Sequence, residues 1–348
     1  MKRLFSVYIR KRLHTKKIDQ HYQHTFLDNE FFDKERNRVA IIQKTISPVK
    51  RLEEFLDSIY NTVNEAVKTK AMYVIFPEYI FFDLFGIIPF YRLLSKFLNK
   101  ENEQTDENPS IHHSTSSENR LLRFIFDLFA EPTEKVILQM MKRLAKQFSI
   151  YIFTGSYLHK ENGRLFNVGT LIDPNGNIVH TQRKVHLTDF EVAIGLSRGE
   201  EFNVVDLPIG KTATPICMDA TYFETFQIVR RQGANIVMIP IANNEKYNEW
   251  KALRGIWPRV QESYVYGLKP ALTGSIAGLK FTGKAGVFAP IEMTENNDGV
   301  VAISENSIGD EIVYANLNVE QLEIIRNVAQ YQNDTNVLFE KDYVKKTY

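Results

Sequence analysis

The sequence has a single cysteine, Cys217, among its 348 residues. One cysteine excludes internal disulfide bonds and the paired cysteines of structural zinc sites. No stretch reaches the roughly 18 consecutive apolar residues that a membrane-spanning helix needs. The basic N-terminus also lacks an apolar core of signal-peptide length. We therefore expect a soluble, intracellular protein of the cytoplasm.

Net charge is nearly absent as well, because 43 Lys and Arg residues balance 42 Asp and Glu residues. Nothing in this balance demands a nucleic acid or another highly charged partner, so we expect none. The apolar share of 44% and the charged share of 24% are typical of a globular protein. A chain of this length forms one large or two ordinary domains and buries a substantial core without cross-links.

The apolar pattern predicts an α/β protein. Residues 38–43 are a short β-rich run, residues 48–71 carry apolar side chains at helical spacing, and residues 72–78 are a second apolar strand. This β-α-β order favours a sheet that is covered by helices. Further along, turn and periodicity signals predict a strand at 150–158, hairpins over 165–187 and 201–217, a helix at 221–234 and a strand at 235–243.

Composition divides the chain into one domain, 38–325, and two flanking segments. Residues 1–37 are charged and irregular and are expected to form an N-terminal extension, and residues 326–348 a C-terminal tail. Within the domain, the segment 84–134 has apolar runs on either side of a polar, low-complexity stretch at 99–119, which we interpret as a mobile loop. This segment could cover a site, form a subunit contact or rest on a membrane surface, and we favour the first two.

Three polar residues follow predicted strands at equivalent places. Cys217 lies where a strand gives way to a helix, Glu78 ends the second strand, and Lys184 stands near the end of a hairpin. Taken singly, the cysteine could be a buried apolar residue and the two charges could be solvated. However, ligands of α/β sheets bind outside the carboxyl ends of strands, so the three side chains can converge in one crevice. A thiol at a helix N-terminus would also favour the thiolate form.

The base that would activate this thiol is not fixed by spacing alone. In a strand, Lys184 and His186 project to the same face, so a Cys–His pair is as compatible with the spacing as a pair with Glu78. The residues by themselves leave both alternatives open.

The segments around these three residues, VIFPE, QRKVHL and ICMDATYFE, resemble the three motifs of the nitrilase superfamily, the carbon–nitrogen hydrolases. The resemblance covers roughly residues 38–320 and makes 38–325 a carbon–nitrogen hydrolase domain. It implies an α/β fold, a four-layer α-β-β-α sandwich, with homodimers formed through a helical face. It also implies a Glu–Lys–Cys triad of Glu78, Lys184 and Cys217, and neither a cofactor nor a metal.

The chemistry of that family gives each residue a role. The thiolate attacks an amide or nitrile carbon and forms a thioester, with Glu78 taking the thiol proton and later activating water. Lys184 and the backbone N–H of Met218 would stabilise the oxyanion. A second glutamate of the family orients the lysine and the substrate, and Glu191 matches its place. The alternative for Glu191 is a solvated loop charge, because two more glutamates lie close by.

The chain departs from the usual pattern of the family at several places. Met218 replaces an aromatic residue after the cysteine, and a proline is missing from the YFE segment. Glu78 and Lys184 are farther apart than usual, and the excess falls in 84–134. Asp219 follows the amidase pattern, whereas nitrilases tend to have glutamate there. We therefore expect an amidohydrolase that cleaves a small non-peptide amide. Nitrile hydrolysis, acyl transfer and a non-catalytic regulatory homologue are the alternatives.

Two further motifs carry little weight. The run GLKFTGKAG at 278–286 nearly spells a phosphate-binding loop, but Ala285 replaces the hydroxyl residue that would hold magnesium. An apolar strand pattern follows it in place of the required helix, so we expect a loop between late strands. His112 and His113 have no third ligand nearby, so a zinc site is not expected.

Overall fold

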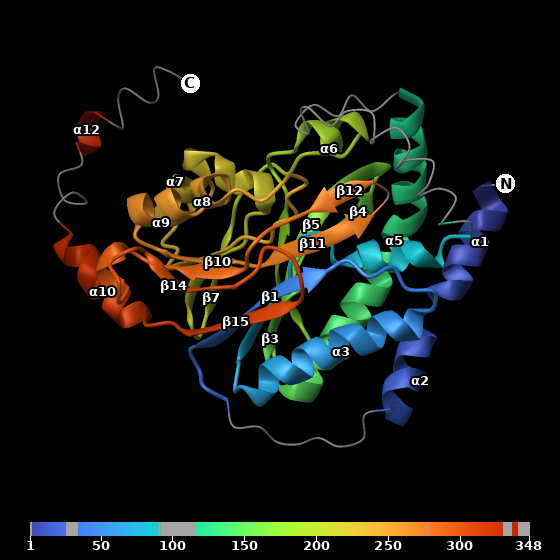
Figure 1. Ribbon diagram of the computed structural model, residues 1–348, viewed down its shortest axis with the longest axis horizontal. Coiled ribbons are helices and arrows are strands. Elements are labelled where there is room, and N and C mark those ends of the chain that lie inside the picture. The colour runs from blue at the N-terminus through green and yellow to red at the C-terminus, as the bar shows by residue number, and fades with distance from the viewer. Residues whose placement is uncertain are drawn as a thin grey trace.

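The computed structural model describes residues 2–25, 34–89, 91, 116–276, 278–329 and 336–339, which build two β-sheets (Figure 1). The first sheet contains β1 (Arg38–Thr45), β2 (Tyr73–Ile75), β3 (Tyr151–Phe153), β4 (Tyr157–Glu161), β5 (Arg164–Ile172), β6 (Ile178–Arg183), β11 (Ala271–Ile276), β12 (Leu279–Phe281) and β15 (Glu311–Asn316). Its order is β12-β11-β1-β2-β3-β5-β4, with β15 paired to β1 and β6 paired to β5.

The second sheet has the order β14-β13-β10-β9-β8-β7. Its strands are β7 (Val204–Leu207), β8 (Gly210–Ala213), β9 (Ile236–Met238), β10 (Tyr266–Lys269), β13 (Gly286–Phe288) and β14 (Val300–Ile303). Parallel pairing of β8, β9 and β10 places the ends of these three strands at one edge. The residues that follow these strands therefore gather at that edge.

Helices cover the outer face of each sheet. The first sheet carries α3 (Leu52–Lys68) and α5 (Ser116–Phe148), and the second carries α7 (Phe223–Arg231), α8 (Glu249–Arg254) and α9 (Trp257–Ser263) (Figure 1). From residue 38 onwards, further described helical segments are η1 (Ile80–Ile87), α6 (Asp189–Ala193), η2 (Cys217–Thr221), η3 (Ile291–Met293), α10 (Val319–Val328) and α12 (Val337–Phe339). This arrangement confirms the expected four-layer α-β-β-α sandwich.

Strand β1 shows how alternating side chains serve two cores. Val39 and Ile41 face the second sheet and belong to the same buried cluster as Met238 of β9. Ala40 and Ile42 point the other way and pack with the apolar face of α3. Because both faces of β1 are buried, the strand reads in the sequence as a continuous apolar run.

Most of the predicted elements form where they were expected, with one correction. The helix within 48–71 is α3, the hairpins are β5–β6 and β7–β8, and the helix within 221–234 is α7. The single strand expected at 150–158 is wrong, because it is split into β3 and β4. Strand β3 pairs with β2, whereas β4 pairs with β5 alone, and the chain turns between them at Gly155, whose φ is +70°.

Gly155 is expected to be the least replaceable glycine of this region. A Cβ atom there would lie 1.8 Å from the carbonyl oxygen of Pro77, next to Glu78. We expect Gly155→Ala to lower the free energy of unfolding by about 3 kcal/mol, measured by urea denaturation. Gly163→Ala is the matched control: its φ is +77° but nothing lies within 4 Å of an added Cβ, so about 1 kcal/mol is expected. Equal losses in the two variants would contradict this account.

The expectation of irregular structure in residues 1–37 is wrong for the described part of that segment. It forms α1 (Lys2–Arg12) and α2 (Lys16–Thr25), which lie against α5 and α3 (Figure 1). Ile9 and Leu13 are four residues apart and are buried in the same core as those helices, as is Tyr22 of α2. This helical spacing was hidden by the many charged residues between the apolar ones.

The 84–134 segment is described only in part. Residues 92–115, which include most of the low-complexity stretch and both histidines at 112 and 113, lie outside the described residues. Residues 116–134 form the first part of α5, a helix of 33 residues that contains Pro132. At the other end of the domain, α10 runs to Val328, past the expected boundary at 325, and Arg326 donates to the carbonyl oxygens of Ala234 and Tyr264.

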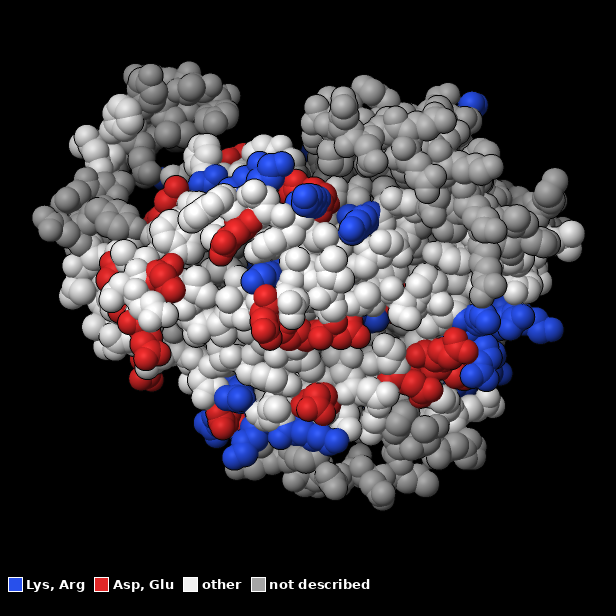
Figure 2. All heavy atoms as spheres, viewed as in Figure 1, with Lys and Arg blue, Asp and Glu red and all other residues white. Residues whose placement is uncertain are grey.

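In the described ranges, no helix has the length and apolar character that crossing a membrane requires. Figure 2 shows that acidic and basic side chains both occur on the visible face, separated by wide uncharged areas. The described surface on this side therefore carries both signs of charge in small groups.

Candidate active site

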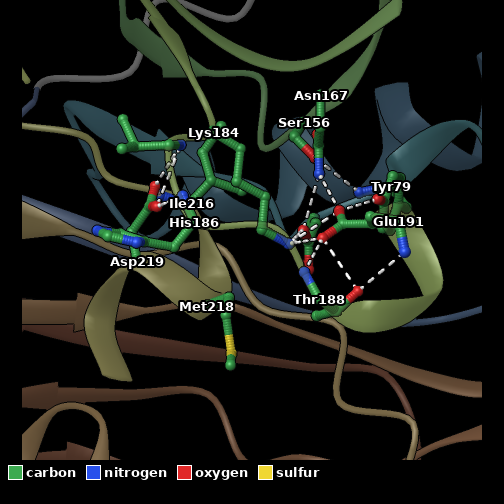
Figure 3. A network of polar contacts seen from close by, with 12 residues as sticks. Tyr79, Ser156, Asn167, Lys184, His186, Thr188, Glu191, Ile216, Met218 and Asp219 are labelled. Atoms are coloured by element: carbon green, nitrogen blue, oxygen red, sulfur yellow. Dashed lines mark hydrogen bonds and ion pairs between the residues drawn. The ribbon is translucent and has the colours of Figure 1, made fainter. Parts of the chain in front are cut away.

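Glu78, Lys184 and Glu191 come from three separate segments and meet in one buried cluster. Figure 3 shows Lys184 and Glu191 in this network of polar contacts. Glu78 follows β2, Lys184 directly follows β6, and Glu191 lies in α6. The Lys184 ammonium is 2.8 Å from Oε1 of Glu78 and 2.8 Å from Oε2 of Glu191. The three side chains are at most 2% exposed, so this ion cluster is shielded from solvent.

Asn167 bridges the two carboxylates and is the main contributor without an assigned role in the sequence prediction. Its Nδ2 donates to Oε1 of Glu78 at 2.9 Å and to Oε1 of Glu191 at 3.1 Å. Its carbonyl oxygen accepts from the backbone N–H of Lys184, because β5 continues beside the β6 end. The asparagine side chain donates hydrogen bonds but carries no charge. It therefore positions the two carboxylates, while the lysine ammonium offsets their negative charge.

Tyr79 adds a second neutral donor, because its hydroxyl hydrogen-bonds Oε1 of Glu191. Its φ of +55° is left-handed, and its backbone N–H donates to Oγ of Ser156 at 3.1 Å. The unusual backbone thus turns the chain directly after Glu78 and aims the ring at Glu191. In the sequence, the one sign that Tyr79 belongs to the site is its position directly after the VIFPE motif.

The alternative of a solvated loop charge for Glu191 is wrong. Thr188 caps α6 by accepting the Glu191 N–H at 3.2 Å, while Oε2 of Glu191 accepts the Thr188 N–H at 2.8 Å. This reciprocal capping box fixes the glutamate side chain before it binds Lys184. The other end of α6 is held by Arg123 of α5, which donates to the carbonyl oxygens of Ile194 and Gly195. The described part of the 84–134 segment therefore contacts the element that carries Glu191.

Burial and the neighbouring charges together decide whether the pKa of each group in the cluster is raised or lowered. Burial raises the pKa of Glu78, and Lys184 only partly offsets this. Burial also opposes ionisation of Glu191, but the Lys184 ammonium and the donors around that carboxylate lower its pKa. Burial disfavours the Lys184 ammonium, yet the two glutamates outweigh it and raise its pKa well above the ordinary value. Glu78 is consequently the member of the cluster best suited to exchange a proton.

Cys217 begins η2 with a left-handed φ of +47°, and its backbone N–H donates to the carbonyl oxygen of Pro240 at 3.0 Å. The residue is partly exposed, and the charges of Glu78 and Lys184 both act on its thiol. Burial and then the charge of Glu78 raise the pKa of the thiol well above its ordinary value, although Lys184 acts in the opposite direction. These effects favour the protonated thiol, which needs a base before it can attack a substrate.

This finding corrects the expectation that a helix dipole would favour the thiolate. Cys217 lies in a 3₁₀-helix of five residues, and α7 starts only at Phe223. Such a short segment has little accumulated dipole, so burial and the neighbouring carboxylate dominate.

Asp219 joins the cysteine segment to the lysine segment. Its carboxylate accepts backbone N–H groups of Ile216 at 2.8 Å, Val185 at 3.1 Å and His186 at 2.6 Å (Figure 3). Burial is the main reason that its pKa is raised, to about 7. Ile216 directly precedes Cys217, and Val185 directly follows Lys184. Asp219 therefore holds the cysteine segment and the lysine segment at a fixed separation.

His186 is poorly placed to serve as the base. Strand β6 ends at Arg183, so the alternation that would put His186 on the same face as Lys184 does not extend to it. Its ring stacks on Tyr222 with 4.2 Å between centroids, and Figure 3 shows it beside Asp219, on the far side of the view from Glu191. Burial lowers the pKa of His186. The geometry thus favours Glu78 as the partner of the thiol.

Among the described residues, no group of three His, Cys, Asp or Glu side chains is arranged to hold a metal ion. The segment 278–286 contains β12 and the beginning of β13, joined by a short connection. A strand, not a helix, follows the connection, as expected.

Comparison with known proteins gives consistent matches. A family model described as carbon-nitrogen hydrolase matches residues 38–261. The probable hydrolase YhcX of Bacillus subtilis (strain 168) is 25% identical over 306 residues, which cover 86% of this chain and 52% of YhcX. Human omega-amidase NIT2 is 26% identical over 211 residues, covering 58% of this chain and 73% of NIT2. The chain spans about half the length of the first curated relatives that it matches.

The fold has counterparts among solved structures. Saccharomyces cerevisiae Nit3, a member of branch 10 of the nitrilase superfamily, superimposes with a TM-score of 0.59 at 19% sequence identity. The match covers 86% of this chain and 97% of Nit3. The two-sheet arrangement with outer helices is therefore shared with Nit3.

Proposed function

Because the chain belongs to the carbon–nitrogen hydrolase family, we propose that it hydrolyses a small non-peptide amide through a thioester on Cys217. The observation that carries this proposal is the buried ion cluster of Glu78, Lys184 and Glu191, whose charges act on the single thiol of the chain. A protonated thiol needs a base, a developing oxyanion needs a cation, and the cluster contains one of each.

In the proposed reaction, Glu78 takes the proton of Cys217 as the sulfur attacks the amide carbon. The tetrahedral oxyanion that forms is stabilised by the Lys184 ammonium and by the backbone N–H of Met218. The carbon–nitrogen bond then breaks, and Glu78 returns its proton to the leaving nitrogen, which departs as ammonia or an amine. The same carboxylate next takes a proton from water, whose oxygen attacks the thioester. The carbon–sulfur bond then breaks, Glu78 returns the proton to the sulfur, and the carboxylic acid leaves.

An amide is favoured over a nitrile as the substrate. Asp219 follows the amidase pattern, and a relative named omega-amidase supports the same choice. Nitrile hydrolysis and acyl transfer use the same thioester, so they remain the alternatives. We further propose a homodimer formed through a helical face, a cytoplasmic location and no nucleic-acid partner, as the resemblance and the balanced charge suggest.

The test is ammonia release from a panel of small amides and nitriles by the purified full chain. We expect release from at least one amide, slower release from its nitrile, and a loss of on the order of 10⁴-fold or more in Cys217→Ala. Transfer to hydroxylamine in place of water would indicate how readily the acyl group leaves to another acceptor. Absence of release from the whole panel, together with an unreactive Cys217, would support the non-catalytic alternative.

A further inference from the structure

Helix α1 carries exposed apolar residues on the face that points away from the protein. Ile9 and Leu13 are buried in the core that α1 shares with α5, whereas Leu4 is 77% and Val7 58% exposed. Leu4, Val7 and Lys11 are three and four residues apart, so they lie on one side of the helix. Single exposed apolar side chains are ordinary on protein surfaces. These two therefore have to be judged together with the charges around them.

Positive charge is concentrated in α1 and the beginning of α2. The first 18 residues contain seven Lys or Arg and no Asp or Glu, although the whole chain has a net charge of only +1. The rest of the chain is consequently net acidic. Figure 1 shows α1 and α2 at one edge of the molecule, where α1 packs on α5 and α2 packs on α3. The excess of positive charge is thus carried by one part of the structure.

Several of these basic side chains are not neutralised within the described part of the chain. Arg10 pairs with Glu131 and Lys17 with Glu53, and all four side chains are partly exposed. Surface pairs of this kind contribute little energy, so either base can exchange its acid for another anion. The exposed basic residues that form no ion pair with a described residue are Lys11, Arg12 and Lys16.

Helix α10 has a similar pair of exposed apolar residues in an acidic setting. Ile324 is 59% and Val328 72% exposed, and they are four residues apart. The exposed charges beside them are Glu320 and Glu323. Figure 1 shows α10 at the end of the molecule opposite to α1. An anionic surface would attract α1 and repel α10, so α10 provides a control with matched apolar exposure.

We propose that α1 and the beginning of α2 bind the surface of an anionic lipid bilayer. The basic side chains are attracted to the anionic headgroups, while Leu4 and Val7 enter the boundary between the headgroups and the acyl chains. A nucleic acid would use the same positive charge, but it has no apolar layer to receive these two side chains. The observations therefore favour the bilayer. This docking does not depend on the hydrolysis proposed above.

The test is co-sedimentation of the full-length protein with vesicles of phosphatidylcholine, alone or with about 30% phosphatidylserine. We expect binding to the anionic vesicles, little binding to the neutral ones, and a loss of binding when NaCl is raised from about 0.1 M to about 0.5 M. The double variant Leu4→Ser/Val7→Ser should weaken partitioning about tenfold. The triple variant Lys11→Gln/Arg12→Gln/Lys16→Gln should weaken it on the order of 100-fold.

Two matched controls separate this face from the rest of the surface. Ile324→Ser/Val328→Ser removes a similar apolar area from α10. Lys211→Gln/Lys246→Gln/Lys251→Gln removes the same charge from exposed lysines of the second sheet and its covering segments. Each control should change partitioning less than about threefold. All these variants alter exposed side chains, so their melting temperatures should stay within about 2 °C of the parent protein.

A fluorescence measurement tests insertion without removing any apolar side chain. Val7→Trp places an indole on the outer face of α1, and Val328→Trp places one on α10. Vesicles with phosphatidylserine and brominated acyl chains should quench the added fluorescence of Val7→Trp and leave that of Val328→Trp unchanged.

Three results would overturn the proposal. The first is equal binding of the parent protein to neutral and anionic vesicles, or none to either. The second is salt-sensitive vesicle binding that Leu4→Ser/Val7→Ser retains in full while Val7→Trp is not quenched, because apolar contact is part of the proposal. The third is binding to a duplex or single-stranded oligonucleotide, but not to vesicles, that only the triple basic variant loses; it would assign the charge to a nucleic acid.

Discussion

Lys184→Met is expected to reduce turnover about 10³-fold or more and to destabilise the fold by about 3–5 kcal/mol. The lysine is the cation that touches both Glu78 and Glu191, so its loss leaves two buried carboxylates without their charge partner. Activity is measured as ammonia release, and stability by urea unfolding. Lys160→Met is the matched control, because Lys160 pairs with Asp127 while 39% exposed and should cost less than about 1 kcal/mol.

The loss of folding stability in Lys184→Met should depend on pH, and the direction of this dependence follows from the pKa shifts. In the wild type, Glu191 has a lowered pKa and stabilises the fold above its ordinary titration range. Without Lys184, both glutamates have raised pKa values in the fold, so they cost stability once the unfolded chain ionises. The stability difference should therefore be small at mildly acidic pH and grow towards neutrality. A difference that is constant across this range would contradict the ion cluster.

Glu78→Gln is expected to have two opposite effects on Cys217. The charge of Glu78 is among the causes of the raised thiol pKa, so its removal makes the thiolate easier to form beside Lys184. The same change removes the base for both half-reactions, and turnover should fall by on the order of 10³-fold. Ultraviolet titration of thiolate absorbance measures the first effect, and the difference from a variant without the thiol separates the one cysteine from the 16 tyrosines.

Cys217→Ser provides the baseline for that titration, since it removes the thiolate signal and keeps the size of the side chain. An unchanged or raised thiol pKa in Glu78→Gln would contradict the contact between the two residues. Full activity in Glu78→Gln would instead assign the base to another group, and His186 would be the first to test by a glutamine substitution.

The sequence predicted the layers of the fold and the members of the cluster because both depend on local patterns. Buried strands such as β1 are continuous apolar runs, and Glu78, Lys184 and Cys217 stand just after strand ends, where ligands of α/β sheets usually bind. Glu191 could be placed only through the family motif. Its burial depends on the capping box with Thr188, which is visible as a spacing but not as a contact.

The features that could not be predicted from the sequence are those that depend on tertiary contacts. Asn167 reaches Glu78 across 89 positions of the chain, and no pattern in the sequence near either residue signals this hydrogen bond. The state of the thiol was also mispredicted, because burial outweighs the dipole of a five-residue helix. The same holds for α1 and α2, whose few apolar residues gain their importance only by packing on α5 and α3.

The most direct test of the account is the intact mass of the protein after acid quenching during turnover of an amide that it hydrolyses. The account predicts an acyl adduct on the wild type that is absent from Cys217→Ala, and that, once formed on Glu78→Gln, is hydrolysed more slowly than on the wild type. The adduct mass equals the substrate minus ammonia or the amine that leaves. Ammonia release that persists in Cys217→Ala, or an adduct that forms on that variant, would contradict it.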